Sequence, residues 1–254
     1  MKNYTTTNLI SLVLILVFTH CQKPNVPIEI SSEDFHEAQD QLTSVMVHDI
    51  FSPPVASRVY AYSNIAAYEI LAQEEGNPHT TFRGVLSDYE GISPIKDSLV
   101  NSKLAALMAY IGVGKNLIFS VDRIKNYMEN LSIQWKEQNP EVYNATHQYA
   151  QQVVGEVKAW YDKDNYNQTR TFPKFYVDYD SPSRWQPTPP DYMDGIEPHW
   201  SKIRPFVLTS SSQFQPEPPP PFSMKPDSEF YKELMEVYQV VKEIHESESD
   251  DERQ

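Results

Sequence analysis

The stretch that decides the fold is residues 55–73, VASRVYAYSNIAAYEILAQ. It contains neither proline nor glycine, and its apolar residues fall on almost every side of a helical wheel. A helix that is apolar nearly all round must be buried by neighbours on several sides. We therefore expect this helix to form the centre of a helical bundle.

Other segments before residue 165 also have apolar residues at helical spacing, and none alternates with the period of two that a strand requires. Ser31 and Ser32, followed by two acidic residues, predict the start of a helix that continues to Ile50 and that Pro53 and Pro54 end. Further helices are expected over 99–113, over 117–135 and after Pro140. Residues 31–164 are thus predicted to be an all-α helical bundle.

The N-terminus has the pattern of an export signal. Lys2 precedes an apolar run, Leu9–Phe18, which is too short to span a membrane. Residues 1–20 are the expected signal and 21–30 a tether. Cys21 directly follows the signal in a pattern that resembles the lipobox of bacterial lipoproteins, although His20 stands where a small residue is usual. We expect an exported protein, periplasmic or on the cell surface, anchored in the membrane by a lipid on Cys21. The alternative is an ordinary export signal with an incidental cysteine.

Composition changes at residue 165. Most of the 20 prolines lie in residues 165–226, which therefore cannot be helical for long. The same residues are rich in aromatic side chains, unlike a disordered spacer. They are predicted to form a long ordered strap over the helices; the alternative is a mobile polyproline segment that binds a partner. An amphipathic helix is expected over 227–246, followed by an acidic tail, 247–254.

Charge and cysteine content exclude several classes of protein. The 35 Asp and Glu residues exceed the 21 Lys and Arg residues, and the net charge of −14 repels phosphate backbones. We expect no nucleic-acid partner. The single cysteine cannot form an internal disulfide, and no His or Cys pair has the spacing of a structural zinc site. No metal site and no resident cofactor are expected in this chain.

The candidate chemistry in the helical part is sparse. Arg58 and Glu69 lie about three turns apart on one side of the central helix, where a buried ion pair or polar network is favoured over a ligand contact. His36 and His48 are about 18 Å apart along one helix at 1.5 Å per residue. That distance prevents them from sharing a metal ion, and both are expected at the surface.

The remaining candidates are His147, His199 and the group Lys202-Ile203-Arg204-Pro205. The two histidines are isolated in the sequence. The basic group is expected to bond backbone carbonyls or acidic side chains, with anion binding as the less favoured alternative. The sequence has no nucleophile elbow, glycine-rich phosphate loop or His-Glu-x-x-His motif. No catalytic residue is therefore assigned.

Several separated motifs nevertheless resemble one family. They are PPVASRVYAYSNIAAYE (53–69), WQPTPP (185–190), PHWSKIRPF (198–206) and PPPPF (218–222). Together with the export signal, this order is similar to the N-terminal half of bacterial vanadium-dependent haloperoxidase proteins, of the superfamily shared with type 2 phosphatidic acid phosphatases. The resemblance implies paired helical bundles, with vanadate or phosphate bound in the C-terminal one by Lys-x6-Arg-Pro, Ser-Gly-His and Arg-x5-His motifs.

None of these three motifs occurs in the chain. Arg204-Pro205 supplies an Arg-Pro pair, but Glu197 stands seven positions before the arginine, and no glycine precedes a histidine. We therefore expect the N-terminal helical part of an exported haloperoxidase- or phosphatase-like lipoprotein, inactive alone, with a missing C-terminal catalytic half as its partner. Vanadate is the cofactor implied for an intact relative. The alternative is a stand-alone helical binding or interaction lipoprotein.

Overall fold

A computed structural model of the chain describes residues 26–247. The predicted export signal (1–20), the first half of the tether (21–25) with Cys21, and all of the acidic tail except Ser247 lie outside the described residues. Within 26–247 there is no strand, so the prediction of an all-α fold is confirmed. The elements in chain order are α2 (Ser32–His48), α3 (Pro53–Leu71), α4 (Ser102–Lys115), α5 (Asp122–Gln138), α6 (Pro140–Tyr161), α7 (Tyr166–Thr169), the 3-10 helix η1 (Trp200–Lys202) and α8 (Glu229–Glu246).

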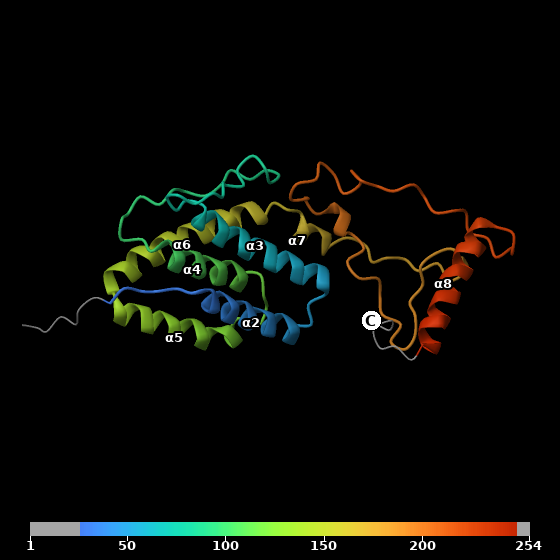
Figure 1. The fold of residues 1–254 in the computed structure, drawn as a ribbon, viewed down its shortest axis with the longest axis horizontal. Coiled ribbons are helices and arrows are strands. Elements are labelled where there is room, and N and C mark those ends of the chain that lie inside the picture. The colour runs from blue at the N-terminus through green and yellow to red at the C-terminus, as the bar shows by residue number, and fades with distance from the viewer. Residues whose placement is uncertain (1–25, 248–254) are drawn as a thin grey trace, which may run out of the picture. The chain divides into compact units, whose positions relative to one another are not determined.

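The chain divides into two compact units between Asp164 and Asn165. The first unit contains α2 to α6, and the second contains α7, η1 and α8. In the first unit α3, α4 and α6 pack against one another, with α2 and α5 beside them (Figure 1). None of the helices in residues 26–247 combines the length and apolarity that crossing a membrane requires.

The centre of the first unit is α4, not α3 as the sequence predicted. Every residue from Leu104 to Gly114 is buried, and α4 packs against α2, α3 and α6. The reason is its small residues, which let neighbours approach on all sides. A Cβ on Gly112 would lie 2.7 Å from Val154 Cγ2, and one on Gly114 would lie 2.7 Å from Leu42 Cδ2. The helix α3 is also largely buried, but it leaves Ser57 and Asn64 exposed.

The helix boundaries confirm some sequence signals and correct others. Ser31 caps α2 in a reciprocal pair of hydrogen bonds with Asp34, as predicted. The prediction that Pro53 and Pro54 end this helix is wrong, because α2 stops at His48 and the two prolines form the first turn of α3. Proline is tolerated there because the first backbone N–H groups of a helix have no partner within it.

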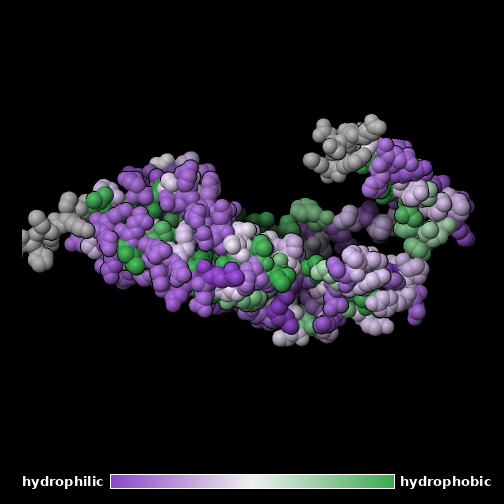
Figure 2. Space-filling view, turned by 90° about the horizontal axis from the view of Figure 1, so that it is seen from below, coloured by the Kyte–Doolittle hydropathy of each residue, from purple (hydrophilic) through white to green (hydrophobic). Residues whose placement is uncertain are grey.

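The helix α5 begins later than its sequence predicted, and little of it is buried. It begins at Asp122 instead of residue 117, and only Ile124 and Trp135 of the helix are buried. The next helix begins at Pro140, as predicted, and the Asn139 side chain caps it by accepting from the backbone N–H of Val142 at 3.2 Å. The face that carries α2 and α5 shows apolar residues scattered among hydrophilic ones (Figure 2).

The second unit has little regular structure before α8. Of its described residues, only Thr169 is buried. The ordered contacts are local, such as Phe175 against Trp185 and Phe222 against Phe230, with ring centroids 5.6 Å and 5.1 Å apart. The helix α8 contains no buried residue, although its sequence is amphipathic.

Candidate functional site

The first unit contains a buried arginine–aspartate pair. Arg58 Nε on α3 donates to Asp164 Oδ2 at 2.7 Å, and the Tyr62 hydroxyl donates to the same oxygen at 2.9 Å. The Arg58 guanidinium also lies 5.0 Å from the ring centroid of Tyr62 and 5.5 Å from that of Tyr161. Both charged side chains are under 10% exposed. This network ties α3 to the chain just after α6 and leaves the charge of Arg58 compensated by protein groups.

Glu69 does not pair with Arg58, although both lie on α3. Its carboxylate accepts from the Thr81 hydroxyl at 2.7 Å and from the backbone N–H of Phe82 at 2.6 Å. Glu69 is buried, so these bonds offset the cost of removing its charge from water. The prediction of buried structural polar groups is confirmed for both residues. The partners Asp164 and Thr81 could not be read from local spacing.

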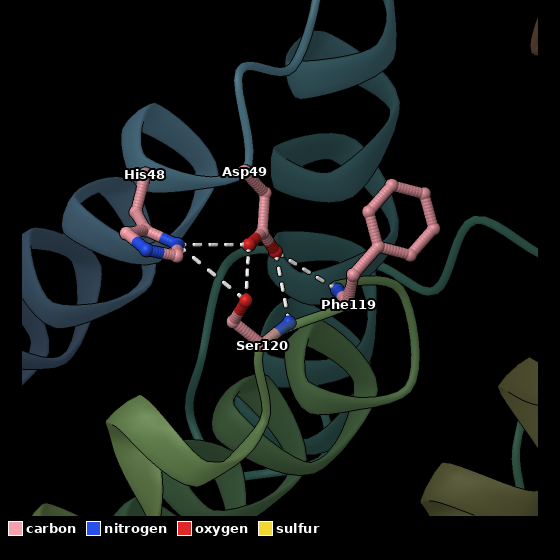
Figure 3. Close-up of polar contacts among 4 residues, drawn as sticks. All are labelled: His48, Asp49, Phe119 and Ser120. Carbon is pink, nitrogen blue, oxygen red and sulfur yellow. Dashed lines mark hydrogen bonds and ion pairs between the residues drawn. The ribbon is translucent and has the colours of Figure 1, made fainter.

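A second polar cluster joins His48 and Asp49 to the loop before α5 (Figure 3). The Asp49 carboxylate accepts from the backbone N–H groups of Phe119 and Ser120, at 3.0 Å and 2.9 Å, and from the Ser120 hydroxyl. His48 Nδ1 lies 3.2 Å from Asp49 Oδ1 and 3.4 Å from Ser120 Oγ. Burial alone would raise the pKa of Asp49, but the hydrogen bonds from Ser120, His48 and Phe119 outweigh it and lower the pKa to about 2.

This cluster contains the residue types of a serine hydrolase without its geometry. In a catalytic triad the imidazole lies between the serine and the aspartate and accepts the hydroxyl proton. Here the single Ser120 hydroxyl proton is donated directly to Asp49. The imidazole is therefore not in position to activate the hydroxyl as a nucleophile. The arrangement instead fastens the loop between α4 and α5 to the end of α2.

The histidines named by the sequence do not come together. His36, His48 and His147 are exposed, which confirms the prediction for the first two. His147 stacks on Tyr143, and His199 Nε2 lies 2.7 Å from the Pro173 carbonyl oxygen. Within residues 26–247 there is no group of three or more His, Cys, Asp or Glu side chains that could hold a metal ion.

The basic group Lys202–Pro205 lies in the second unit, at and after η1. The Lys202 carbonyl accepts from the Asn165 amide at 2.9 Å. Glu197, at the position where a Lys-x6-Arg-Pro motif has its lysine, forms a two-point ion pair with the Arg170 guanidinium. A carboxylate at this position would repel an oxyanion, because both groups are negatively charged.

Comparison with known proteins relates this chain to a solved structure. No family model and no curated protein matches the chain. A solved structure, that of a bacterial vanadium-dependent iodoperoxidase, superposes with a TM-score of 0.83 at 49% sequence identity and covers 88% of this chain. The chain belongs to the vanadium haloperoxidase-like superfamily. The match spans 54% of the iodoperoxidase chain, so this protein corresponds to about half of its length.

The superfamily implies vanadate or phosphate as the bound oxyanion, and the described residues do not fit that group. An oxyanion requires several converging cations or N–H donors. Arg58 is compensated by Asp164, and Arg170 is paired with Glu197. None of the histidines within residues 26–247 is buried. We therefore assign no residue of this superfamily member to vanadate or phosphate.

Proposed function

We propose that this chain is the N-terminal helical part of a vanadium haloperoxidase- or phosphatase-like protein, and that it has no catalysis of its own. The observation that carries the proposal is the 49% identity to an iodoperoxidase over 88% of this chain but only 54% of that one. The lack of all three oxyanion-binding motifs in the sequence is consistent with it. The role of the chain is then to supply a helical framework for a catalytic half.

The surface of α8 supports this role. Phe230, Leu234, Val237 and Val241 follow one another at steps of four, three and four residues, which places them along one stripe of the helix. Leu234, Val237 and Val241 are 41%, 62% and 46% exposed. An apolar stripe of this kind is normally covered. Under the proposal, the catalytic half covers it.

Activity assays of the purified 254-residue chain test the proposal. We expect no vanadate-dependent oxidation of iodide or bromide and no hydrolysis of p-nitrophenyl phosphate above a heat-denatured control. A second polypeptide that carries the Lys-x6-Arg-Pro, Ser-Gly-His and Arg-x5-His motifs, added in trans, is expected to bind the chain through α8. Vanadate-dependent turnover by the chain alone would contradict the proposal.

Membrane anchoring through Cys21 is part of the same proposal. Two or three acyl chains make a stable anchor, at about 0.8 kcal/mol per buried methylene. Labelled palmitate fed to the expressing bacterium is expected on the native chain and absent from Cys21→Ser, which should also leave the membrane fraction. His20→Ala, which places a small residue before the cysteine, is expected to keep the label. Label on Cys21→Ser would rule out this site.

A stand-alone binding protein is the second candidate, and one cavity favours it. In the second unit, Phe175, Trp185, Pro189 and Met193 contribute to the lining of an open cavity of about 590 Å3. Such dimensions suit a glycan or a peptide partner. The DNA immediately downstream of the coding sequence separates the two candidates. A continuing or frameshifted reading frame with the three motifs supports the catalytic partner, and an unrelated gene supports the binding protein.

A further inference from the structure

The first unit exposes a small group of large apolar side chains where α2 ends. Val47, Ile50 and Phe119 are 72%, 89% and 78% exposed. A turn joins the first two, because the Ile50 backbone N–H donates to the Val47 carbonyl at 3.1 Å. Phe119 belongs to the loop before α5, and its ring lies edge-on to that of Phe51, with centroids 5.0 Å apart. We call Val47, Ile50 and Phe119 the apolar tip.

The backbone at Ile50 is strained. The Phe51 backbone N–H donates to the Met46 carbonyl at 3.0 Å, which together with the bond from Ile50 closes the end of α2. In this pattern the residue after the cap takes a left-handed conformation, and the φ of Ile50 is 55°. Glycine is usual at such a position, because a β-branched side chain crowds the backbone there. Ile50 is strained yet almost fully exposed, so its side chain gains little from packing within the first unit.

The Asp49 cluster determines where the apolar tip lies. The Asp49 side chain is only 3% exposed, and it accepts from the backbone N–H of Phe119 at 3.0 Å. Ile50 follows Asp49 directly in the chain. The Phe119 ring points away from the carboxylate (Figure 3). A buried polar contact therefore holds Phe119 beside the end of α2 and leaves its ring at the surface. A surface held in place before binding loses less conformational entropy when a partner covers it.

From the strain at Ile50 and the exposure around it, we propose that the apolar tip is a docking surface for the catalytic half, separate from the stripe on α8. The inference rests on the proposed function, under which a catalytic half exists. Strained conformations persist where they serve a contact, and Ile50 has none of note within its own unit. The surface of the catalytic half that covers the tip is expected to be apolar, because the three side chains offer it neither charge nor hydrogen bonds.

The size of the tip favours the catalytic half over a second copy of this chain. An interface between freely diffusing proteins typically buries about 800 Å2 on each side. Even a large aromatic side chain buries only about 150–250 Å2, so three side chains do not supply that area. The iodoperoxidase match leaves nearly half of that chain unmatched, and this remainder belongs to the same polypeptide as the matched part. A domain on the same polypeptide docks at a high effective concentration, so a small contact is enough.

Thiol labelling tests whether a catalytic half covers the tip. Val47→Cys is made together with Cys21→Ser, which removes the native cysteine of this chain. Its labelling by N-ethylmaleimide is followed by peptide mass spectrometry in the full 254-residue chain and in a chimera. In the chimera, this chain replaces the matched part of the iodoperoxidase. We expect labelling at least about tenfold slower in the chimera, because the interface must open first. Lys103→Cys, at an exposed position of α4, should label at similar rates in both proteins.

Ile50→Gly separates a docking role from a structural one. Glycine relieves the left-handed strain, and a side chain that is 89% exposed loses almost no packing. The urea midpoint of the isolated chain should therefore rise. In the chimera the same substitution removes a contact, so the midpoint should fall and the labelling of Val47→Cys should become faster. Ile133→Ala, at a position of α5 that is 58% exposed, is the control and should leave the labelling of Val47→Cys unchanged.

Slow labelling in the chimera and opposite effects of Ile50→Gly in the two proteins support the inference. Equally fast labelling in the chain and in a chimera that oxidises iodide with vanadate would overturn it and leave the proposed function intact. A folded chimera without vanadate-dependent turnover would contradict the proposed function, and the inference with it. Labelling that slows in the isolated chain as its concentration rises would assign the tip to a second copy and overturn the inference.

The intact iodoperoxidase provides a measurement that does not depend on the folding of the chimera. A cysteine introduced at its position aligned with Val47 should label as slowly as in the chimera. Fast labelling there would overturn the inference.

Discussion

The two units of this chain use their apolar residues in opposite ways. In the first unit the apolar residues of α4 are buried from Leu104 to Gly114. In the second, the amphipathic α8 has no buried residue, and Trp185, Tyr176 and Phe214 are 49%, 84% and 78% exposed. Burial of apolar surface is the main favourable contribution to folding. The first unit is therefore expected to account for most of the stability of the chain, whereas the second exposes apolar surface that, under our proposal, a partner covers.

The largest expected effect tests the buried network of the first unit. Asp164→Ala removes the partner of Arg58 and the acceptor of the Tyr62 hydroxyl. Removing one member of a buried ion pair costs about 3–5 kcal/mol, because the other charge is left buried and unpaired. Urea unfolding followed by circular dichroism measures this loss. Glu129→Ala, which removes an exposed ion pair, is the control and should cost under about 0.5 kcal/mol.

A loss of less than about 1 kcal/mol for Asp164→Ala would show that water compensates Arg58 after the substitution. Water would then reach the interior of the first unit more easily than the burial of Arg58 indicates. The two units would differ less in how well they exclude water.

A Leu→Ala substitution in each unit measures directly how differently the two units bury their apolar residues. Leu107 on α4 is fully buried, whereas Leu234 on α8 is 41% exposed. Leu107→Ala should lower the free energy of unfolding by about 2–5 kcal/mol, because it leaves a cavity in the core. Leu234→Ala should lower it by less than about 0.5 kcal/mol. Similar losses at both positions would mean that α8 is packed in solution, and would contradict the assignment of its stripe as open surface.

Sequence patterns predicted the helices well where the signal was local. The capping residues at Ser31, the proline that begins α6 and the amphipathic pattern of α8 each depend on neighbours within four residues. The prediction that Pro53 and Pro54 end α2 was wrong, because two prolines are compatible both with ending one helix and with starting the next. The prediction that α3 is the centre of the bundle was wrong. Hydrophobicity alone does not show how closely neighbouring helices approach at small residues such as Gly112 on α4.

The polar clusters were harder to predict, because their partners are distant in sequence. Arg58 could be expected to need a partner, but Asp164 lies 106 positions away. Ser120 lies 71 positions from Asp49, and no local motif joins them. The family, by contrast, could be recognised from motifs spread over both units, since that signal does not require knowing which residues touch.

A smaller effect tests the Asp49 cluster through pH. The pKa of Asp49 falls from its ordinary 3.8 to about 2 in the folded chain. A lowered carboxyl pKa contributes stability above pH 4, and this contribution is lost as the pH falls from 4 to 2. We expect about 1 kcal/mol, less than the shift alone implies, because the cluster opens to solvent at His48.

Urea midpoints at pH 6 and pH 2.5 measure this contribution. The fall between the two pH values should be smaller in Asp49→Asn than in the native chain, and Asp40→Asn, on the exposed side of α2, should behave like the native chain. An unchanged fall in Asp49→Asn would mean that the hydrogen bonds from Ser120 and Phe119 do not favour the ionised carboxylate.

The smallest expected effect on stability concerns the apolar stripe of α8. It tests whether the apolar residues of the second unit are exposed, in contrast to those of the first. Val237→Lys/Val241→Lys places two charges at positions that are 62% and 46% exposed. Surface substitutions of this kind change the free energy of unfolding by less than about 0.5 kcal/mol.

An uncovered apolar stripe favours self-association of the chain. The two lysines should therefore reduce self-association, and sedimentation velocity over a range of concentrations measures it. Glu236→Lys/Gln239→Lys, two exposed polar positions of the same helix, is the control and should associate like the native chain. A destabilisation above about 1 kcal/mol in the valine variant would show that α8 packs against protein in the isolated chain. The apolar stripe would then not be open for a catalytic partner.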